Sequence, residues 1–220
     1  MGAARLSLRS ETAAQFWKLC GSGTGEGFTP RPNWGVWAIL ATWPDEATAR
    51  ARVAQSPVWQ RWRARAAEHW TVYLEPISSR GTWAGGTPFQ PGDGPPPDAK
   101  APIAALTRAT VRPSRAWRFW SRVPDISATI GADANVAFKI GIGEVPLLHQ
   151  VTFSVWPDAA AMARFARGDG PHGRAIAAVR AGDWFAEELY ARFRLLGADG
   201  IWGGGDPLAR LKKSHTKDAA

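Results

Sequence analysis

The feature that most constrains the fold is that the second half of the chain repeats the first. Three tryptophan-centred motifs occur twice, in the same order and with similar neighbours. They are QFWK at 15–18 with RFWS at 118–121, ATWPD at 41–45 with SVWPD at 154–158, and GTWAGG at 81–86 with GIWGGG at 200–205. Because the spacing between partners grows slowly along the chain, we interpret the halves as two copies of one unit, with small insertions in the second copy.

A proline- and glycine-rich segment, 90–102, separates the two copies. It has no hydrophobic periodicity, and so many Pro and Gly residues cannot hold a regular ladder, which indicates a linker. We therefore predict a first repeat over 1–89, a second repeat over 103–211 and a flexible polar tail over 212–220.

The second copy has the clearer pattern of secondary structure. Its hydrophobic periodicity predicts the order strand, helix, strand, strand, helix, strand. The strands are expected at 103–112, 136–145, 149–156 and 188–196, and the helices at 113–130 and 157–181, the second interrupted at 168–170. This order is that of the ferredoxin-like unit.

The first copy follows the same order less completely. A helix is expected near 11–20, a strand at 34–43, a helical stretch at 44–69 broken at Ser56 and Pro57, and a strand at 70–75; the first strand is represented only by 5–8. Two such units bury both inner sheet faces against each other, which one unit alone cannot do. We predict an α+β protein of two ferredoxin-like (βαββαβ) repeats packed as an intramolecular dimeric α/β barrel.

The composition narrows the possible functions. A single cysteine excludes an intrachain disulfide framework, and also a zinc ribbon or iron–sulfur cluster held by this chain alone. No apolar run approaches the roughly 18 residues of a spanning helix, and the first ten residues lack the apolar core of a signal peptide. No nucleophile elbow, HExxH motif or carboxylate cluster supports a hydrolase. We expect a cytoplasmic protein, free or peripheral to a membrane.

His172 is the first candidate ligand for a metal or cofactor. It stands in the run GPHG at 170–173, at the predicted restart of a helix. There the positive end of the helix dipole favours neutral imidazole, which is the metal-binding form, and the flanking glycines leave room for a large planar group. The first copy has Val58 and Trp59 at the matching positions, so we expect one site per chain. The alternative is a surface histidine at a helix start.

His149 is the second candidate ligand. It shares strand parity with Val151 and Phe153, so it is expected on an apolar face, where a satisfied core histidine is the alternative. Of the other histidines, His69 is interpreted as a helix-end residue that suits the helix dipole, and His215 lies in the polar tail.

Cys20 and the glycines that follow it have simple interpretations. A lone thiolate can ligate haem iron, but Cys20 is more typical of a small buried hydrophobic residue. The run GSGTGEG at 21–27 lacks the lysine and hydroxyl residue that end a phosphate-binding P-loop, so we interpret it as a flexible connection from helix to strand.

A basic, tryptophan-rich stretch at 59–65 offers a different function. Three arginines alternate there with Trp59 and Trp62 in a predicted helix. Such a face suits single-stranded nucleic acid, lipid headgroups or an acidic electron-transfer protein; a solvated helix face is the plain alternative.

Nearly the whole chain, from about Trp17 to Leu208, is similar to the spheroidene monooxygenases, carotenoid oxygenases of purple photosynthetic bacteria. The runs that carry the resemblance are NWGVWAILATW at 33–43, RWRARA at 61–66, PIAALTRAT at 102–110, FWSRVP at 119–124, KIGIGEVP at 139–146, GPH at 170–172 and EELYARFR at 187–194. The chain departs from the family pattern before Phe16, which affects the first strand and not the chemistry.

The resemblance implies a haem-dependent monooxygenase. It would use O2 and reduced ferredoxin to insert oxygen at C-2 of an acyclic carotenoid, converting spheroidene to spheroidenone through two hydroxylations and loss of water. The cofactor would be haem b, with His172 as axial ligand of the iron and His149 as runner-up; no catalytic residue is assigned. A net charge of +8 suits an acidic ferredoxin and peripheral contact with the anionic inner (photosynthetic) membrane, where the substrate dissolves.

Two other functions stay open on the sequence. One is a haem-binding protein or haem dehydratase of the same fold without carotenoid oxygenase activity. The other is a nucleic-acid-binding module built on 59–65, although no nucleic acid partner is expected for an oxygenase.

The 13 tryptophans divide into two groups. Eight form repeat pairs and are interpreted as scaffold: Trp17 with Trp120, Trp43 with Trp156, Trp70 with Trp184, and Trp83 with Trp202. The unpaired Trp34, Trp37, Trp59, Trp62 and Trp117 are the better candidates for contact with substrate, membrane or partner.

Overall fold

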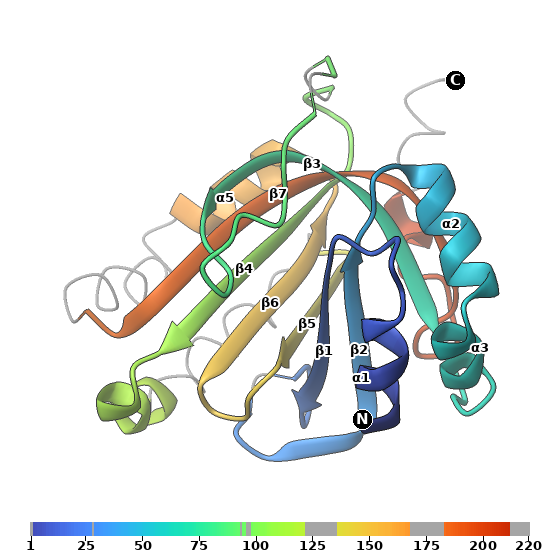
Figure 1. The fold of residues 1–220 in the computed structure, drawn as a ribbon. Helices are drawn as coiled ribbons and strands as arrows, with labels where there is room; N and C mark the ends of the chain where they lie inside the picture. Colours follow the sequence, from blue (N-terminus) through green and yellow to red (C-terminus); the bar gives the residue numbers. More distant parts are fainter. Residues whose placement is uncertain are drawn as a thin grey trace.

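The structure, a computed structural model, describes residues 2–27, 29–92, 94–95, 98–121, 136–167 and 183–211. Within these residues the chain has a mixed α+β fold built on one curled, antiparallel, seven-stranded sheet of order β2-β1-β5-β6-β4-β7-β3 (Figure 1). The strands are β1 (Phe16–Gly23), β2 (Pro32–Thr42), β3 (Trp70–Gly81), β4 (Ile103–Val111), β5 (Phe138–Gly143), β6 (His149–Trp156) and β7 (Phe185–Gly200).

The helices begin at residues that suit helix starts. They are α1 (Gly2–Arg9), α2 (Glu46–Gln55), α3 (Pro57–Arg63) and α5 (Ala159–Arg167), with a 3-10 turn, η1 (Pro113–Arg115), that continues into helical residues 116–121. Asp45 caps α2 by accepting the backbone N–H of Thr48 at 2.7 Å, and Pro57 opens α3. None of these described helices combines the length and apolar character needed to cross a membrane.

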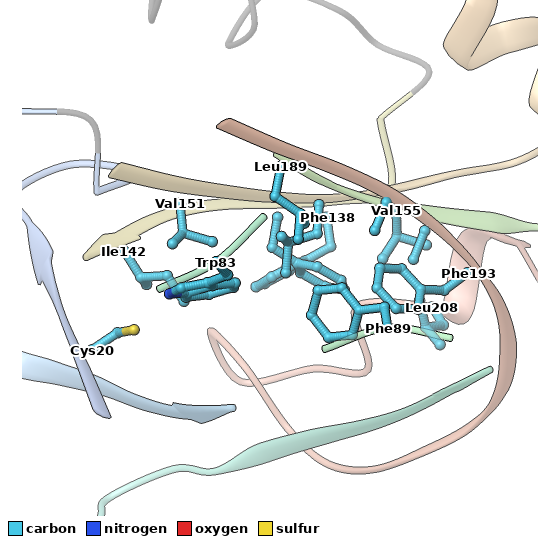
Figure 2. Close-up of a cluster of buried hydrophobic side chains, with 14 of the residues drawn as sticks. Cys20, Trp83, Phe89, Phe138, Ile142, Val151, Val155, Leu189, Phe193 and Leu208 are labelled. Carbon is cyan, nitrogen blue, oxygen red and sulfur yellow. The ribbon is translucent and has the colours of Figure 1, made fainter. Parts of the chain in front are cut away.

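The main core lies on the inner face of the curled sheet (Figure 2). Alternate residues of each strand point into it, as Val151, Phe153 and Val155 do from β6. Trp83, which follows β3, is 1% exposed and packs against Phe89 from the next loop. The inner face is therefore filled by side chains from both halves of the chain.

Helices cover the outer face in two places. On one side α1, α2 and α3 bury a second cluster that includes Leu8, Val53 and Trp59. On the other, α5 packs Met162 against Trp156 of β6. The helices thus cover the outer face of the first-half strands and of β6, while the polar cluster described below lies on the inner face.

Several elements confirm the sequence predictions. β6 has the predicted bounds, and β4, β5 and β7 lie where strands were expected in the second half. In the first half, β2, β3 and the helical stretch broken at Ser56 and Pro57 also appear. Residues 90–102 form no helix or strand where the structure describes them. The predicted tail 212–220 and the helix restart after 170 lie outside the described residues.

The first 23 residues correct the sequence analysis. The helix expected near 11–20 is wrong, because β1 occupies Phe16–Gly23, and the strand expected at 5–8 is replaced by α1. Consequently Trp17, on β1, is not the counterpart of Trp120, which is helical. The tryptophan motif does not distinguish the two elements, because an aromatic pair suits a helix or a strand, so QFWK and RFWS match in sequence although they differ in structure.

The first half supplies three strands and the second half four, all within one sheet whose described edges are β2 and β3. Two separate, complete four-stranded ferredoxin-like sheets are therefore not seen in the described residues. The two-repeat dimeric barrel stays a prediction.

Two turns nevertheless have closely matching structures. In each, a tryptophan pairs with the glycine three residues later: Trp83 with Gly86, and Trp202 with Gly205. In each, two successive backbone N–H groups bind one glutamate, Glu187 for the first turn and Glu68 for the second. Both the turns and the glutamates are 119 residues apart in sequence (83 to 202, 68 to 187).

The β3–β7 ladder has the same spacing. Trp70 pairs with Gly200, and Gly81 pairs with Leu189. Adding 119 to residue 70 gives 189, and subtracting 119 from residue 200 gives 81, so the first pair corresponds to the second. The residue pairs in one half of the ladder therefore correspond to those in the other half. This correspondence is expected if β3 and β7 are copies of one strand.

We predict that Gly81→Ala and Gly200→Ala each destabilise the protein by at least about 2 kcal/mol. Both glycines have a positive φ (+94° and +90°), and a Cβ at either would lie 2.1 Å from a backbone carbonyl oxygen. Urea denaturation followed by circular dichroism measures the loss.

Gly86→Ala and Gly205→Ala are the matched controls, because a Cβ there meets nothing closer than 3.8 Å. These variants should stay within about 1 kcal/mol of the parent. Equal losses in all four variants would contradict the explanation.

Candidate functional site

Five polar side chains gather at one end of the inner core. Lys18 comes from β1, Arg108 from β4, Glu187 from β7, Glu144 from the loop after β5, and His149 from the start of β6. We call these five residues the charged cluster. Strands from both halves of the chain therefore meet in one site.

Arg108 lies at the centre of the charged cluster. Its side chain is 2% exposed, contacts the carboxylate of Glu187 directly, and lies 3.8 Å from that of Glu144. Its guanidinium also lies over the indole of Trp83, 5.6 Å from the ring centroid. Because burying an unpaired charge costs several kcal/mol, the two carboxylates are what allow this arginine to be buried. Its Nε has no hydrogen-bond partner.

Glu187 is fixed by the turn that follows β3. It accepts the Thr82 hydroxyl at 2.9 Å and the backbone N–H groups of Gly85 at 2.8 Å and Ala84 at 3.2 Å. Burial raises the pKa of this carboxyl, but these three donors, with the charge of Arg108, outweigh burial and lower the pKa from 4.5 to about 2. Glu187 is therefore ionised at neutral and mildly acidic pH.

Glu144 joins three parts of the chain. It accepts the indole N–H of Trp83 at 2.7 Å and forms an ion pair with Lys18 at 2.9 Å. A buried indole N–H normally requires an acceptor, so Glu144 permits the burial of Trp83. The loop after β5 is thereby tied to β1 and to the turn after β3.

His149 lies on the inner face at the start of β6, as its strand parity predicted. Its side chain is 27% exposed, and its Nδ1 is 3.5 Å from a carboxylate oxygen of Glu144. That Nδ1 is buried and faces this carboxylate outside ordinary hydrogen-bond geometry. Burial lowers the pKa of His149 more than the charge of Glu144 raises it, which favours neutral imidazole.

Cys20 is buried beside the charged cluster. Burial, with a further contribution from the charge of Glu144, raises the pKa of its thiol to about 12. The residue is therefore a protonated thiol at neutral pH and behaves as the predicted small hydrophobic residue.

Other candidates from the sequence lie elsewhere. His172 and His215 are outside the described residues. His69 does not end a helix, since α3 ends at Arg63; its backbone carbonyl instead accepts the N–H of Ile201 at 2.7 Å. The glycine run at 21–27 connects two strands, β1 and β2, rather than a helix and a strand.

The basic, tryptophan-rich stretch forms α3 and packs inward. Trp59 is buried, and Trp62 packs against the same cluster beneath α1, α2 and α3. Arg61 contacts Ser7, and Arg63 donates to the backbone carbonyl of Val53 at 2.7 Å. These indoles are therefore engaged with the protein and not presented for stacking on bases.

A pocket of about 540 Å³ lies beside these helices. Its lining includes Glu11, Arg52 and Arg61 together with several serines. Ligand pockets for apolar molecules are lined mainly by hydrophobic side chains, so this polar pocket does not suit a carotenoid.

The chemistry of the charged cluster follows from its composition. Two cations balance two carboxylates, and neutral His149 sits at the margin. Among the described residues, no group of three or more His, Cys, Asp or Glu side chains is placed to hold a metal ion. The cluster therefore supplies fixed charges and one titratable imidazole at the end of an apolar interior, an arrangement common at functional sites.

Sequence reasoning missed four of the five cluster residues. A signal was present for Arg108, which shares strand parity with Leu106 and is the charged residue of a strand rich in apolar side chains. For Lys18 the equivalent signal, its parity with Cys20, depends on recognising β1 as a strand. Glu144 and Glu187 gave no sequence signal, because their partners are distant in the chain.

Comparison with known proteins finds close relatives. The chain is 60% identical over 205 residues to the spheroidene monooxygenase of Rhodobacter capsulatus, an alignment that covers 93% of this chain and 85% of that protein. It is 56% identical over 220 residues to the spheroidene monooxygenase of Cereibacter sphaeroides, covering 100% of this chain and 67% of the relative. No protein-family profile matches the chain.

Solved structures are similar only at a distance. A putative monooxygenase from Fusobacterium nucleatum matches with a TM-score of 0.44 and 11% identity, over 93% of this chain and 87% of that one. This degree of structural similarity does not indicate a shared activity.

We predict that Glu187→Gln lowers the free energy of unfolding at pH 7 by about 3 kcal/mol, because Arg108 loses a buried carboxylate. The stabilisation from a carboxyl whose pKa is lowered on folding is complete above pH 4.5 and is lost as the pH falls toward about 2. The variant should therefore lose less stability than the parent over that pH range. Denaturation curves at pH 7, 4.5 and 3 measure both effects.

Glu188→Gln, one residue along β7, controls for removal of a carboxylate. It should stay within about 1 kcal/mol of the parent at pH 7. If the two variants behave alike, the Arg108–Glu187 contact does not stabilise the fold.

Proposed function

The chain belongs to the spheroidene monooxygenase family, and from that membership we propose that it inserts oxygen into an acyclic carotenoid, converting spheroidene to spheroidenone at C-2. The observation that carries the proposal is 60% identity across 93% of the chain to a protein of that name. In this reaction a CH2 group is hydroxylated twice and the resulting diol loses water. Each hydroxylation takes one O2, two electrons and two protons, and releases one water.

We propose haem b as the cofactor and His172 as the residue that would ligate its iron. When bound, the haem supplies the activation of O2. The support for His172 is its sequence setting, in which glycines flank a histidine at a predicted helix start.

His149 fits this role less well. Its neutral imidazole suits a metal, but its Nδ1 faces the Glu144 carboxylate at 3.5 Å and the inner face around it is packed with side chains. Trp83 and Arg108 are almost completely buried there, and Cys20 is fully buried. Because these packed neighbours disfavour a planar macrocycle beside His149, we propose His172 as the ligand and keep His149 as the runner-up.

The described part of the chain contributes two things to the proposed reaction. The packed inner face holds the sheet rigid, since β3 and β7 join the two halves. The charged cluster presents His149, the neutral group there that can accept a proton. The predicted pairing of two ferredoxin-like repeats into a barrel belongs to the same proposal and is supported by the matching turns at Trp83 and Trp202.

Reduced ferredoxin is the proposed electron donor. The net charge of +8 on this chain would favour the approach of an acidic ferredoxin. We further propose a cytoplasmic protein in peripheral contact with the inner membrane, because the substrate dissolves in lipid.

Removing the proposed haem ligand should remove the haem. We predict that His172→Ala abolishes the Soret absorbance of the purified protein or shifts it strongly, while His149→Ala keeps it. The measurement is an absorbance scan of each variant after expression with added haem precursor, with circular dichroism to confirm folding. Loss of the Soret band only in His149→Ala would reverse the assignment.

The enzymatic proposal predicts a specific product. Parent protein, spheroidene, O2, ferredoxin and ferredoxin reductase should give first a hydroxylated carotenoid and then a ketone, detected by liquid chromatography and mass spectrometry. Omission of ferredoxin should lower the product yield by about tenfold or more, because the reaction needs electrons from this donor. Haem binding without product under these conditions would favour a haem-binding protein or haem dehydratase. Absence of haem together with salt-dependent binding of single strands would favour the nucleic-acid module.

A further inference from the structure

Exposed apolar side chains gather at one end of the sheet. Trp34 and Trp117 are 75% and 70% exposed, and Leu147 is 43% exposed. Trp37 and Val145 are exposed beside them. We call these five residues the apolar edge; the described part of the chain has only four other exposed large hydrophobic residues. Three of the five are tryptophans that the repeat leaves without a partner.

These residues come from three segments that meet at the end of the sheet where β4 stops and β6 begins. The start of β2, the loop between β5 and β6, and the helical turn after β4 all lie along the lower edge of the view in Figure 1. Trp120, in the helical turn, donates its indole N–H to the carbonyl of Leu147 at 2.9 Å. Val111, at the end of β4, donates to the carbonyl of Leu148 at 2.8 Å. The turn and the loop are therefore in direct contact.

The start of β2 belongs to the same end. Asn33 pairs with Ser22, and Ser22 pairs with Ile142 of β5, so these three residues form one row across three strands. At the usual strand spacing of about 4.8 Å, the row spans about 10 Å. Trp34 follows Asn33 directly, and Val145 follows Ile142 by three residues. The residues of the apolar edge therefore lie on neighbouring segments at this end of the sheet.

A β-bulge in β2 places Trp34 and Trp37 on the surface. The β1–β2 register shifts between Gly21 and Ser22, so residues 34–36 lie outside the ladder. The indole N–H of Trp37 donates to the carbonyl of Trp34 at 2.8 Å, and the two rings lie 6.1 Å apart. The bulge thus holds two indoles together on the surface instead of in the core.

Basic side chains border the apolar edge. Arg31 precedes β2, and Arg115 and Arg118 lie in the turn after β4. Arg118 stacks near Trp117, with 5.8 Å between the guanidinium carbon and the ring centroid. Of the described acidic residues here, Glu26 is paired with Lys139 and Asp183 with Arg112. The border is therefore net positive.

We propose that the apolar edge is the surface by which this protein docks on an anionic lipid bilayer. Tryptophan prefers the boundary between headgroups and acyl chains, where its ring is apolar and its N–H stays hydrated. Arginines at the rim meet the anionic headgroups. This docking proposal specifies which face makes the membrane contact proposed above. It rests on the proposed function only for the identity of the substrate that dissolves in the lipid.

The test is sedimentation with vesicles that contain no carotenoid. The parent should bind vesicles of phosphatidylcholine with phosphatidylglycerol, and bind pure phosphatidylcholine more weakly. Trp34→Ala with Trp117→Ala should weaken binding about tenfold or more. Arg31→Gln with Arg118→Gln should weaken binding to anionic vesicles by about fivefold for each arginine and leave binding to neutral vesicles unchanged.

Ile201→Ala is the matched control for Leu147→Ala, because Ile201 is 45% exposed in the turn at Trp202 and away from the edge. The Leu147 variant should bind more weakly and the Ile201 variant should bind like the parent. Parent protein that stays in solution with both vesicle types, or edge variants that bind as the parent does, would overturn the proposal. If the apolar edge instead binds an acidic protein partner, the parent protein should stay in solution with both vesicle types.

A second measurement separates this proposal from the proposed function. With spheroidene embedded in vesicles, the Trp34 and Trp117 double variant should form product at least about tenfold more slowly than the parent. With the carotenoid delivered in cyclodextrin, the two should be equal. If no variant forms product in either assay, the oxygenase proposal fails while vesicle sedimentation still decides the docking surface.

Discussion

The ladder between β3 and β7 is the interaction on which the rest of the structure depends. It is the longest pairing in the sheet and joins the last strand of the first half to the last strand of the second. At each of its ends a tryptophan-glycine turn closes the strand and binds a glutamate through two backbone N–H groups. Because Glu187 is one of these glutamates, the ladder also places the carboxylate that allows Arg108 to be buried.

The two similar turns, at Trp83 and Trp202, have different surroundings. At the first turn Trp83 is buried and its glutamate neutralises an arginine of β4. At the second turn Trp202 is exposed, and Glu68 accepts the N–H groups of Gly203 and Gly204. Duplicated geometry therefore carries a charged site in one place and a simple strand closure in the other. An enzyme that handles an apolar substrate benefits from this division, because fixed charges stay confined to one end of an otherwise apolar interior.

The tryptophans likewise separate into structural and surface groups once the fold is known. Trp59 and Trp62 enter the core beneath α1, α2 and α3, whereas Trp34 and Trp117 face solvent beside arginines. The proposed docking edge and the proposed carotenoid chemistry are complementary, since a substrate that dissolves in a bilayer must enter from it. The edge lies on the bulge at the start of β2, on the loop between β5 and β6, and on the helical turn after β4.

The sequence by itself determined the strands of the second half, because β4, β5 and β6 carry short alternating or continuous apolar runs that favour strands. It also determined the family, since long runs of identical residues need no structure to be recognised. Only the tertiary structure decided that 16–23 is a strand, that Glu144 and Glu187 meet Arg108, and which tryptophans are exposed. The physical reason is the same for each: these features depend on pairing and packing between different segments of the chain, and local periodicity records only what neighbouring residues do.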